Sequence, residues 1–282
     1  MIEIMKWSVA HGATAVHYDQ KPLRRTPGFK GMAKDFRRLR KMQLDGIPIG
    51  AITPVDHWFT LRSNWPKKFL TTKFNFPVDL PDEEALSLQP KSGRPTINVL
   101  MVGKMAQPRK RHLWLIDALS SAKVDCHLTI CGAGLDLQHD DGTRSTEYFN
   151  ALKSRAEEIN REGQFSIELC EFVPFKEMPS YYGKADIFVL PSTNEEFGIS
   201  VLEAMAARCA CVVTDTVGAA HHITHGKDGL LFEEANFKDF ETQIHLLLRD
   251  ESKRSQIQFN ARRTVEENHN LDQFAQFIAS LG

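Results

Sequence analysis

From residue 97 onward, short apolar segments alternate with longer amphipathic ones, and this alternation constrains the fold more than any other feature of the sequence. The apolar segments end in glycine or polar turns, whereas the segments between them carry apolar residues three and four positions apart. Such an alternation is typical of βαβ units, which pair their strands in a parallel sheet covered by helices. The sequence therefore predicts an α/β fold with a complete, doubly wound, Rossmann-like domain at residues 91–265.

The expected elements of this domain follow from the same pattern. Strands are predicted at 97–105, 126–134, 166–173, 186–192, 210–216 and 229–232. Helices are predicted at 112–121, 146–163, 176–185, from 199 onward, 239–250 and 252–270. Ligands of doubly wound sheets bind outside the carboxyl ends of the strands. We therefore expect the loops after "MVG", "ICGAG", "EFV" and "LPSTNEE" to line one crevice.

The first 90 residues contain parts of a second domain. "GATAVHYD" and "GIPIGAITPV" are typical of strands, residues 29–43 of an amphipathic helix, and the Pro-, Gly- and Ser-rich stretch 87–96 of a linker. We expect a partial N-terminal domain at 1–90, and a C-terminal helix at 266–282 that crosses back toward it.

Composition limits the cellular setting. The formal net charge is −1, which gives no indication of a nucleic-acid partner, although residues 1–50 contain ten Lys and Arg against four Asp and Glu. The five cysteines are odd in number and mostly lie in apolar runs, so we expect a reducing cytoplasm and neither a metal site nor a disulfide framework. No run reaches the roughly 18 apolar residues of a membrane span, and no secretory signal is recognisable. We expect a cytoplasmic protein, either soluble or peripheral on the inner face of the membrane.

The segment "NEEFGISVLEAMA" carries the most specific chemical signal. Glu195 and Glu203, with seven residues between them, flank a turn at Gly198. The first amides of a helix that begins near Ile199 present positive partial charge to an anion. A carboxylate repels phosphate but accepts charge-assisted hydrogen bonds from two vicinal sugar hydroxyls. The segment therefore indicates sugar binding, although Ser200 and Glu203 also fit a capping box, which needs no ligand.

A second loop, "VGKMAQPRKRHL", adds two lysines at the carboxyl end of the first strand of the domain. Lys104 and Lys110 are compact point charges that suit a diphosphate. The alternative is a solvated loop whose basic residues bind nothing.

Together these segments resemble the retaining, nucleotide-sugar-dependent glycosyltransferases of the two-domain GT-B fold, family 4 or "group 1". The resemblance covers residues 97 to about 235. It rests on the two glutamates, with "FG" before the helix and "LEAMA" within it. Lys104 falls where the family usually has Arg after Gly103, and Lys110 falls on the family's diphosphate-binding Lys.

The resemblance implies a set of site residues. The donor-binding residues would be Gly103, Lys104, Lys110, Phe172, Val173, Glu195, Phe197, Gly198, Ile199 and Glu203. The catalytic residues would be Glu195, His17, Lys104 and Lys110. Glu203 would hold the nucleotide ribose, Glu195 the donor-sugar hydroxyls, and the base would rest near Phe172 and Val173.

Three further roles follow from the same resemblance. The amides of residues 197–199 would contact the sugar and diphosphate, and the two lysines would neutralise the leaving diphosphate without a metal ion. His17 matches the cleft histidine of the family's acceptor domain, the alternative being a histidine that merely ends a strand.

Apart from Lys104, the chain departs from the family pattern in two motifs and at its front end. The family's Gly-x-Pro is Arg208, Cys209 and Ala210 here, and its "GG" followed by Glu is Gly218, Ala219 and His222. The third departure is the short front end, since family members normally have well over a hundred residues before "GATAVHYD". We therefore expect either a fragment or a missing piece supplied by another chain, with exposed strand edges that favour self-association.

The function that this implies is retaining transfer of a sugar from a UDP-, GDP- or ADP-sugar to a sugar or lipid-linked acceptor, in polysaccharide or glycolipid biosynthesis and without a cofactor. One alternative is a non-catalytic or partner-dependent nucleotide-sugar-binding remnant. Another is a GT-B nucleotide-sugar epimerase, which is less favoured because the sequence offers no further acid and base for the sugar carbon. With an incomplete acceptor domain, we expect donor binding to be retained and turnover by this chain alone to be poor.

The amphipathic helix expected at residues 29–43 generates a testable prediction. Its six Lys and Arg side chains lie away from most of its apolar stripe. If this basic face binds a membrane, the chain will sediment with vesicles containing anionic lipid and not with neutral vesicles, because each nearby cation contributes up to about 1 kcal/mol. Equal sedimentation with both vesicle types would instead indicate a solvated face of a helix packed on the core.

Overall fold

The computed structural model describes residues 17–18, 49–51, 71–73, 75, 77–81, 96–134, 143–193, 195 and 197–279. The chain forms two compact units, one of residues 1–77 and 268–282, the other of residues 78–267. The basic helix expected at 29–43 and nearly all of the expected linker lie outside the described residues. The domain boundaries expected near 90 and 265 stay predictions.

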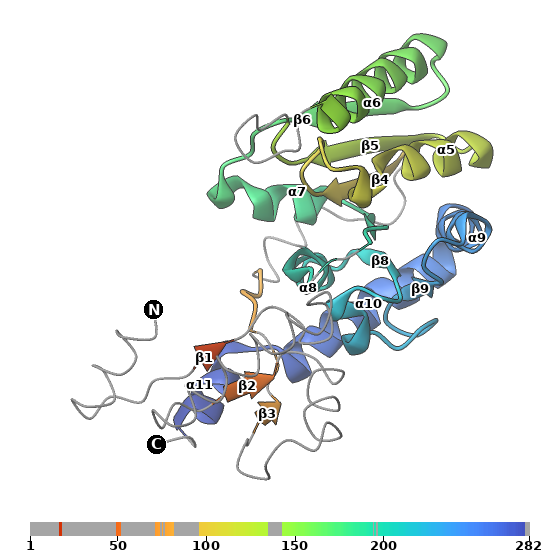
Figure 1. The fold of residues 1–282 in the computed structure, drawn as a ribbon. Coiled ribbons are helices and arrows are strands. Elements are labelled where there is room, and N and C mark those ends of the chain that lie inside the picture. Colours follow the sequence, from red (N-terminus) through yellow and green to blue (C-terminus); the bar gives the residue numbers. More distant parts are fainter. Residues whose placement is uncertain are drawn as a thin grey trace. The chain divides into compact units, whose positions relative to one another are not determined.

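The larger unit is built on a six-stranded parallel sheet (Figure 1). Its strands, in spatial order, are β6 (Ser166–Cys170), β5 (Cys126–Cys131), β4 (Ile97–Val102), β7 (Ile187–Leu190), β8 (Ala210–Thr214) and β9 (Leu230–Phe232). The direction of winding reverses between β4 and β7, which pair side by side. This is the switch point at which open α/β sheets bind ligands. The predicted doubly wound α/β fold is confirmed.

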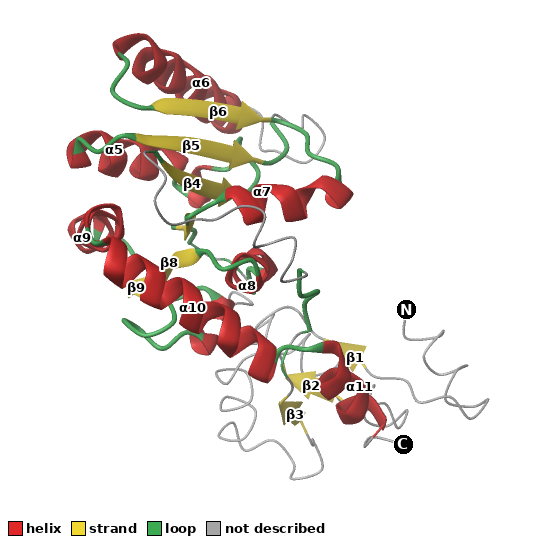
Figure 2. Cartoon of the chain, turned by 180° about the vertical axis from the view of Figure 1, so that it is seen from behind, coloured by secondary structure: helices red, strands yellow, loops and turns green. Residues whose placement is uncertain are grey.

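Helices cover both faces of this sheet (Figure 2). On one face lie α5 (His112–Ala122), α6 (Thr143–Glu162) and α9 (Phe237–Arg249), and on the other lie α7 (Met178–Lys184) and α8 (Ile199–Ala206). Two buried side chains tie the long helix α10 (Glu251–Asn268) to the rest of the unit. Gln258 Nε2 donates to the Asp186 carbonyl at 2.9 Å, and Arg262 Nη1 donates to the Ala206 carbonyl at 2.6 Å.

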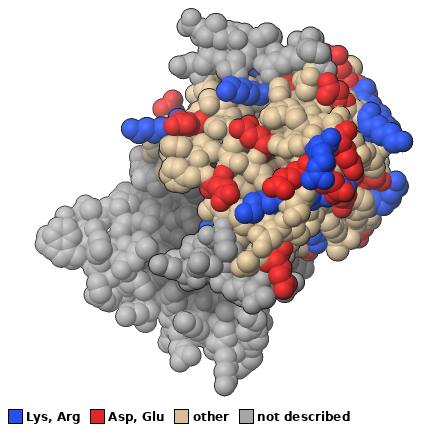
Figure 3. Space-filling model, turned by 90° about the horizontal axis from the view of Figure 1, so that it is seen from above, with Lys and Arg blue, Asp and Glu red and all other residues tan. Residues whose placement is uncertain are grey.

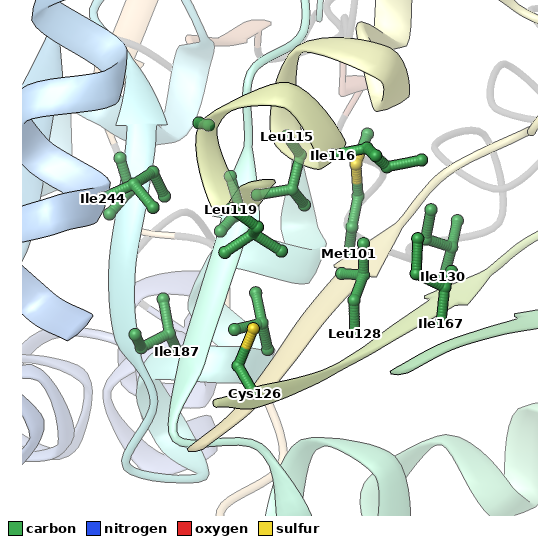
Figure 4. Packing of buried hydrophobic residues seen from close by; sticks show 14 of the residues in the cluster. Met101, Leu115, Ile116, Leu119, Cys126, Leu128, Ile130, Ile167, Ile187 and Ile244 are labelled. Atoms are coloured by element: carbon green, nitrogen blue, oxygen red, sulfur yellow. The ribbon is translucent and has the colours of Figure 1, made fainter. Parts of the chain in front are cut away.

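The core of this unit lies where α5 meets the sheet (Figure 4). Leu115 and Leu119 lie one turn apart on α5 and pack against sheet residues that include Met101 and Leu128. All four side chains are at most 1% exposed. Truncating such a residue to alanine typically costs about 2–5 kcal/mol, so this contact fixes α5 against β4 and β5.

Charged side chains of both signs are interspersed on the face of this unit shown in Figure 3. Among the ion pairs of this unit, Arg155 of α6 pairs with Glu158 at 2.7 Å and with Asp117 of α5 at 3.7 Å. Exposed pairs of this kind contribute about 0–1 kcal/mol each. The buried cluster, and not the surface charge, therefore stabilises the unit.

The smaller unit contains a three-stranded parallel sheet in the order β1 (His17–Tyr18), β2 (Ile49–Ala51) and β3 (Thr71–Lys73). It also contains α11 (Leu271–Ala279). The strands expected within "GATAVHYD" and "GIPIGAITPV" are confirmed at these positions, although each is shorter than the segment that predicted it.

The close approach of two loops generates a stability prediction. A Cβ atom at Gly132, just after β5, would lie 2.0 Å from the carbonyl oxygen of Gly103, just after β4. We expect Gly132→Ala to lower the free energy of unfolding by roughly 1–3 kcal/mol, because the Gly103 backbone must move. Urea unfolding measures this change.

Gly183→Ala in α7 is the matched control, because the added Cβ has no described heavy atom within 4 Å apart from its chain neighbours and the backbone of its own helix. Alanine is the better helix former by about 1 kcal/mol, so this variant should be neutral or stabilised. Equal unfolding midpoints for the two variants would show that the loop contact at Gly132 does not constrain the fold.

Candidate functional site

Two loops meet where the sheet reverses its direction of winding. The first follows β4 and contains Gly103, Lys104 and the short helical turn η2 (Pro108–Lys110), and the second runs from the end of β7 to α8. The backbone amide of Thr193 in the second loop donates to the carbonyl oxygen of Arg109 in the first at 2.9 Å. The structure thus joins the two sequence segments from which the site was predicted.

Lys110 connects these loops through its side chain. It is only 8% exposed, and its side chain crosses Gly103 so closely that a Cβ there would lie 3.1 Å from Lys110 Cδ. Lys110 Nζ donates to Glu195 Oε2. Burial lowers the pKa of Lys110 below its ordinary value, while the Glu195 carboxylate opposes that shift. The predicted lysine and glutamate are therefore in direct contact, with the cation largely removed from water.

Arg109 is a second cation on the same carboxylate. Its Nη1 lies 3.2 Å from Glu195 Oε2, and its side chain is 38% exposed. This residue was not predicted from the sequence, because a run of basic side chains does not indicate which of them turns toward a carboxylate. Lys104 follows Gly103 in the same loop and is half-buried.

The start of α8 excludes the capping-box alternative. The residue that caps this helix is Gly198, at φ 80°, which has no side chain to bond to the first amides, and Ser200 lies inside the helix. A Cβ at Gly198 would lie 3.0 Å from both Leu190 Cδ2 and Val217 Cγ1. Glycine therefore suits this position for its backbone conformation and for the space available.

Glu203 bonds to a tyrosine instead of the helix start. The Tyr182 hydroxyl on α7 donates to Glu203 Oε2 at 2.7 Å. Burial, followed by the neighbouring Glu203 charge, raises the pKa of Tyr182, which keeps the phenol protonated as a donor. This partner lies 21 positions away in the chain and could not be identified from helical spacing.

The remaining predicted site residues lie around this centre or outside it. Phe197 is buried, its carbonyl accepts from the Ala219 amide at 2.7 Å, and its ring meets that of His222 edge-on at 5.8 Å between centroids. His222 ends the short turn η4 (Gly218–His222), so this departure from the family pattern contacts the loop that carries Glu195.

Two predicted positions are not brought against these loops by any described contact. Phe172, 83% exposed, and Val173 follow β6, two strands away from β4. Phe175, in the short turn η3 (Phe175–Glu177), is similarly exposed and was not predicted. His17 belongs to β1 in the smaller unit.

A buried histidine lies beneath the first loop. His112 begins α5 and is fully buried, with the Tyr148 hydroxyl 3.4 Å from its Nδ1. Burial lowers the pKa of His112 to about 3, against an opposing hydrogen-bond contribution from the Gly103 backbone, and the Lys110 charge lowers it further. The neutral imidazole is therefore the form that fits this position.

A cavity of about 420 Å³ lies elsewhere, alongside α7 on the face of β4, β5 and β6. Its lining includes His127, Glu168, Tyr181 and Lys184.

Within the described part of the chain, no three His, Cys, Asp or Glu side chains are grouped so that they could hold a metal ion. All five cysteines are free thiols. The described helices include none with the length and hydropathy required to cross a bilayer.

Comparisons with known proteins identify what this arrangement is similar to. The family model described as "Glycosyl transferases group 1" matches residues 87–264. Over 76 residues the chain is 47% identical to the N,N'-diacetylbacillosaminyl-diphospho-undecaprenol alpha-1,3-N-acetylgalactosaminyltransferase of Campylobacter jejuni, covering 27% of this chain and 20% of that protein. Over 169 residues it is 25% identical to the 2-deoxystreptamine N-acetyl-D-glucosaminyltransferase of Niallia circulans, covering 59% of this chain and 40% of that protein. The matched segments thus span less than half of either relative.

The fold has solved counterparts. The crystal structure of HepE from Anabaena in complex with UDP superposes with a TM-score of 0.72 at 18% identity, covering 99% of this chain and 74% of that one. The fold of this chain is therefore that of the GT-B glycosyltransferases, as predicted from the sequence.

The buried His112 generates a pH prediction. Its pKa of about 3 lies below the value near 6.5 that an unfolded chain gives it, so the unfolded state binds more protons between these two pH values. The contribution of His112 to the free energy of unfolding is therefore fully present above pH 6.5. It falls toward pH 3, by up to about 1.4 kcal/mol per pH unit. Urea unfolding at pH 7, 6, 5 and 4 measures the slope.

His112→Gln should flatten that decline while keeping a polar side chain at the position. Its absolute stability at pH 7 does not enter the comparison, because only the slope with pH reports the imidazole. An unchanged slope would mean that other groups govern acid unfolding.

Proposed function

We propose, because the chain belongs to the group 1 glycosyl transferases, that it takes part in transfer of a sugar from a nucleotide-sugar to an acceptor with retention of anomeric configuration. The observation that carries this proposal is the placement of Glu195 and Glu203 on either side of the α8 start, with Lys110 and Arg109 reaching the first of them from the neighbouring loop. Anion-binding and hydroxyl-binding groups are thereby combined at the sheet's switch point.

The proposed donor contacts divide by charge. The diphosphate would be held by Lys104, Lys110 and the backbone amides at the start of α8, which present positive partial charge. Glu195 would accept hydrogen bonds from the donor sugar and Glu203 from the ribose. The base would lie near residues 172–173, after β6, with Gly103 allowing the backbone to approach the phosphates.

The proposed chemistry breaks the bond between the anomeric carbon and the diphosphate oxygen. The acceptor hydroxyl attacks from the face that the diphosphate leaves, its oxygen bonds to the anomeric carbon, and its proton passes to the departing phosphate. Lys104, Lys110 and the helix amides offset the negative charge that grows on that phosphate, which is electrostatic catalysis by groups already in place and uses no metal ion.

The acceptor side of the proposal rests on sequence. We assign donor binding to residues 91–265, acceptor-side structure to residues 1–90 with His17 as its cleft histidine, and a return crossing to residues 266–282. The printed name of the Campylobacter relative gives it a diphospho-undecaprenol acceptor, which supports a lipid-linked or sugar acceptor here and a role in polysaccharide or glycolipid assembly at the cytoplasmic face of a membrane.

One experiment tests the proposal. Calorimetry with UDP, GDP, ADP and their sugars identifies the nucleotide, and transfer from the bound donor to free and lipid-linked acceptors follows, with NMR of the product reporting the anomer. Transfer with the anomeric configuration of the donor is the expected result. Binding without transfer would indicate the non-catalytic or partner-dependent module, and an inverted product or no nucleotide binding would overturn the proposal.

The role proposed for Glu203 gives a prediction. Glu203→Ala should weaken both the nucleoside diphosphate and the nucleotide-sugar by roughly 1–3 kcal/mol, because both ligands contain the ribose and lose charge-assisted hydrogen bonds to it. Calorimetry measures both affinities, and thermal melting shows whether the variant is folded.

Tyr182→Phe is the companion variant, because it removes the hydroxyl that donates to Glu203 Oε2 while leaving the carboxylate in place. Its effect on affinity should be smaller than that of Glu203→Ala. Unchanged affinity in a folded Glu203→Ala protein would be incompatible with a ribose contact.

A further inference from the structure

We propose that Arg109 is a positioning residue for Glu195, holding this carboxylate in place when Lys110 turns to the diphosphate of a bound donor. This inference rests on the proposed function. It concerns a residue to which neither the sequence motif nor the family resemblance assigns a role.

Two cations share one carboxylate oxygen at this site. Lys110 and Arg109 both contact Glu195 Oε2. An arriving diphosphate brings more negative charge to Lys110 than one carboxylate does, so the lysine is drawn toward the phosphates. Glu195 would then lose a cation while a second anion lies nearby, and the two would repel each other in a partly desolvated site.

Arg109 remains with Glu195 because the backbone of Arg109 is hydrogen-bonded to the loop that carries Glu195. Its carbonyl oxygen accepts from the Thr193 amide at 2.9 Å, and the Thr193 hydroxyl lies 3.5 Å from the same oxygen. Glu195 is two positions after Thr193. The backbone bond and the side-chain ion pair therefore span the same two loops, and motion of Lys110 breaks neither of them.

The geometry also determines which carboxylate oxygen a sugar can use. Among the described residues, both cations contact Oε2 of Glu195, so Oε1 is the oxygen that can accept from a donor-sugar hydroxyl. A guanidinium fixes the orientation of a carboxylate better than an ammonium group does, because its donors lie in a rigid plane. Arg109 would thus act on sugar recognition through Glu195, without touching the ligand.

The partial exposure of Arg109 makes this role testable. Its side chain is 38% exposed, so replacing it removes an ion pair without opening a hole in the core. The variants are Arg109→Gln, which removes the charge, and Arg109→Lys, which keeps it. Arg263→Gln is the matched control, because Arg263 forms an exposed pair with Glu267 on α10.

The measurement compares a nucleotide-sugar with the matching nucleoside diphosphate, which lacks the sugar. We expect Arg109→Gln to weaken the nucleotide-sugar about tenfold more than the matching nucleoside diphosphate, since the loss concerns the charge-assisted contact of Glu195 with the sugar. Arg109→Lys should recover part of that difference, and Arg263→Gln should change neither affinity. Calorimetry with each purified variant of the 282-residue chain provides the values.

A double-mutant cycle separates positioning from general charge. Because Arg109 acts through Glu195, combining Arg109→Gln with Glu195→Gln should cost the nucleotide-sugar no more than Glu195→Gln alone. Equal losses for both ligands in Arg109→Gln, or additive losses in the double variant, would overturn the inference. Failure of the unsubstituted protein to bind either ligand would instead overturn the proposed function, so the two failures are distinguishable.

Discussion

The ion pair between Lys110 and Glu195 joins the two loops at the point where the sheet reverses its winding, and the geometry of the candidate site depends on it. One partner comes from the loop after β4 and the other from the loop after β7, so the pair forms only if these strands are neighbours. The core packing of α5 on the sheet and the close approach of Gly132 to Gly103 fix the first loop. The site is therefore a product of strand order as much as of the residues themselves.

Much of this arrangement follows from local patterns in the sequence. The strands and helices of the larger unit were predictable because apolar periodicity and glycine-bearing turns agree along the chain. Glu195 and Glu203 were identifiable because their spacing places them on either side of one helix start. The contacts of these two glutamates were not predictable, because Tyr182 and Arg109 meet them only after α7 and η2 are packed on the sheet. The capping-box interpretation failed for a related reason, since the helix begins at a glycine whose left-handed backbone ends the turn.

The departures from the family pattern also gain a physical meaning. Arg208, at the family's glycine position, has φ 58°, which is a left-handed conformation that a side chain makes less favourable. The next residue compensates in part, because the Cys209 thiol donates to the Tyr182 carbonyl at 3.2 Å and so ties the end of α8 to α7. His222 packs edge-on against Phe197, which places an aromatic contact where the family has a carboxylate.

The burial of Lys110 affects how ionic strength acts on the site. Salt screens charges that are in water, with a Debye length of about 8 Å at physiological ionic strength, and acts much less on charges that the protein has already dehydrated. Lys110 is 8% exposed, whereas Lys104 in the same loop is half-buried. The attraction of the site for a phosphate group thus has two components. The contribution of the buried Lys110 persists at high salt concentration, whereas that of the more accessible Lys104 decreases as salt is added.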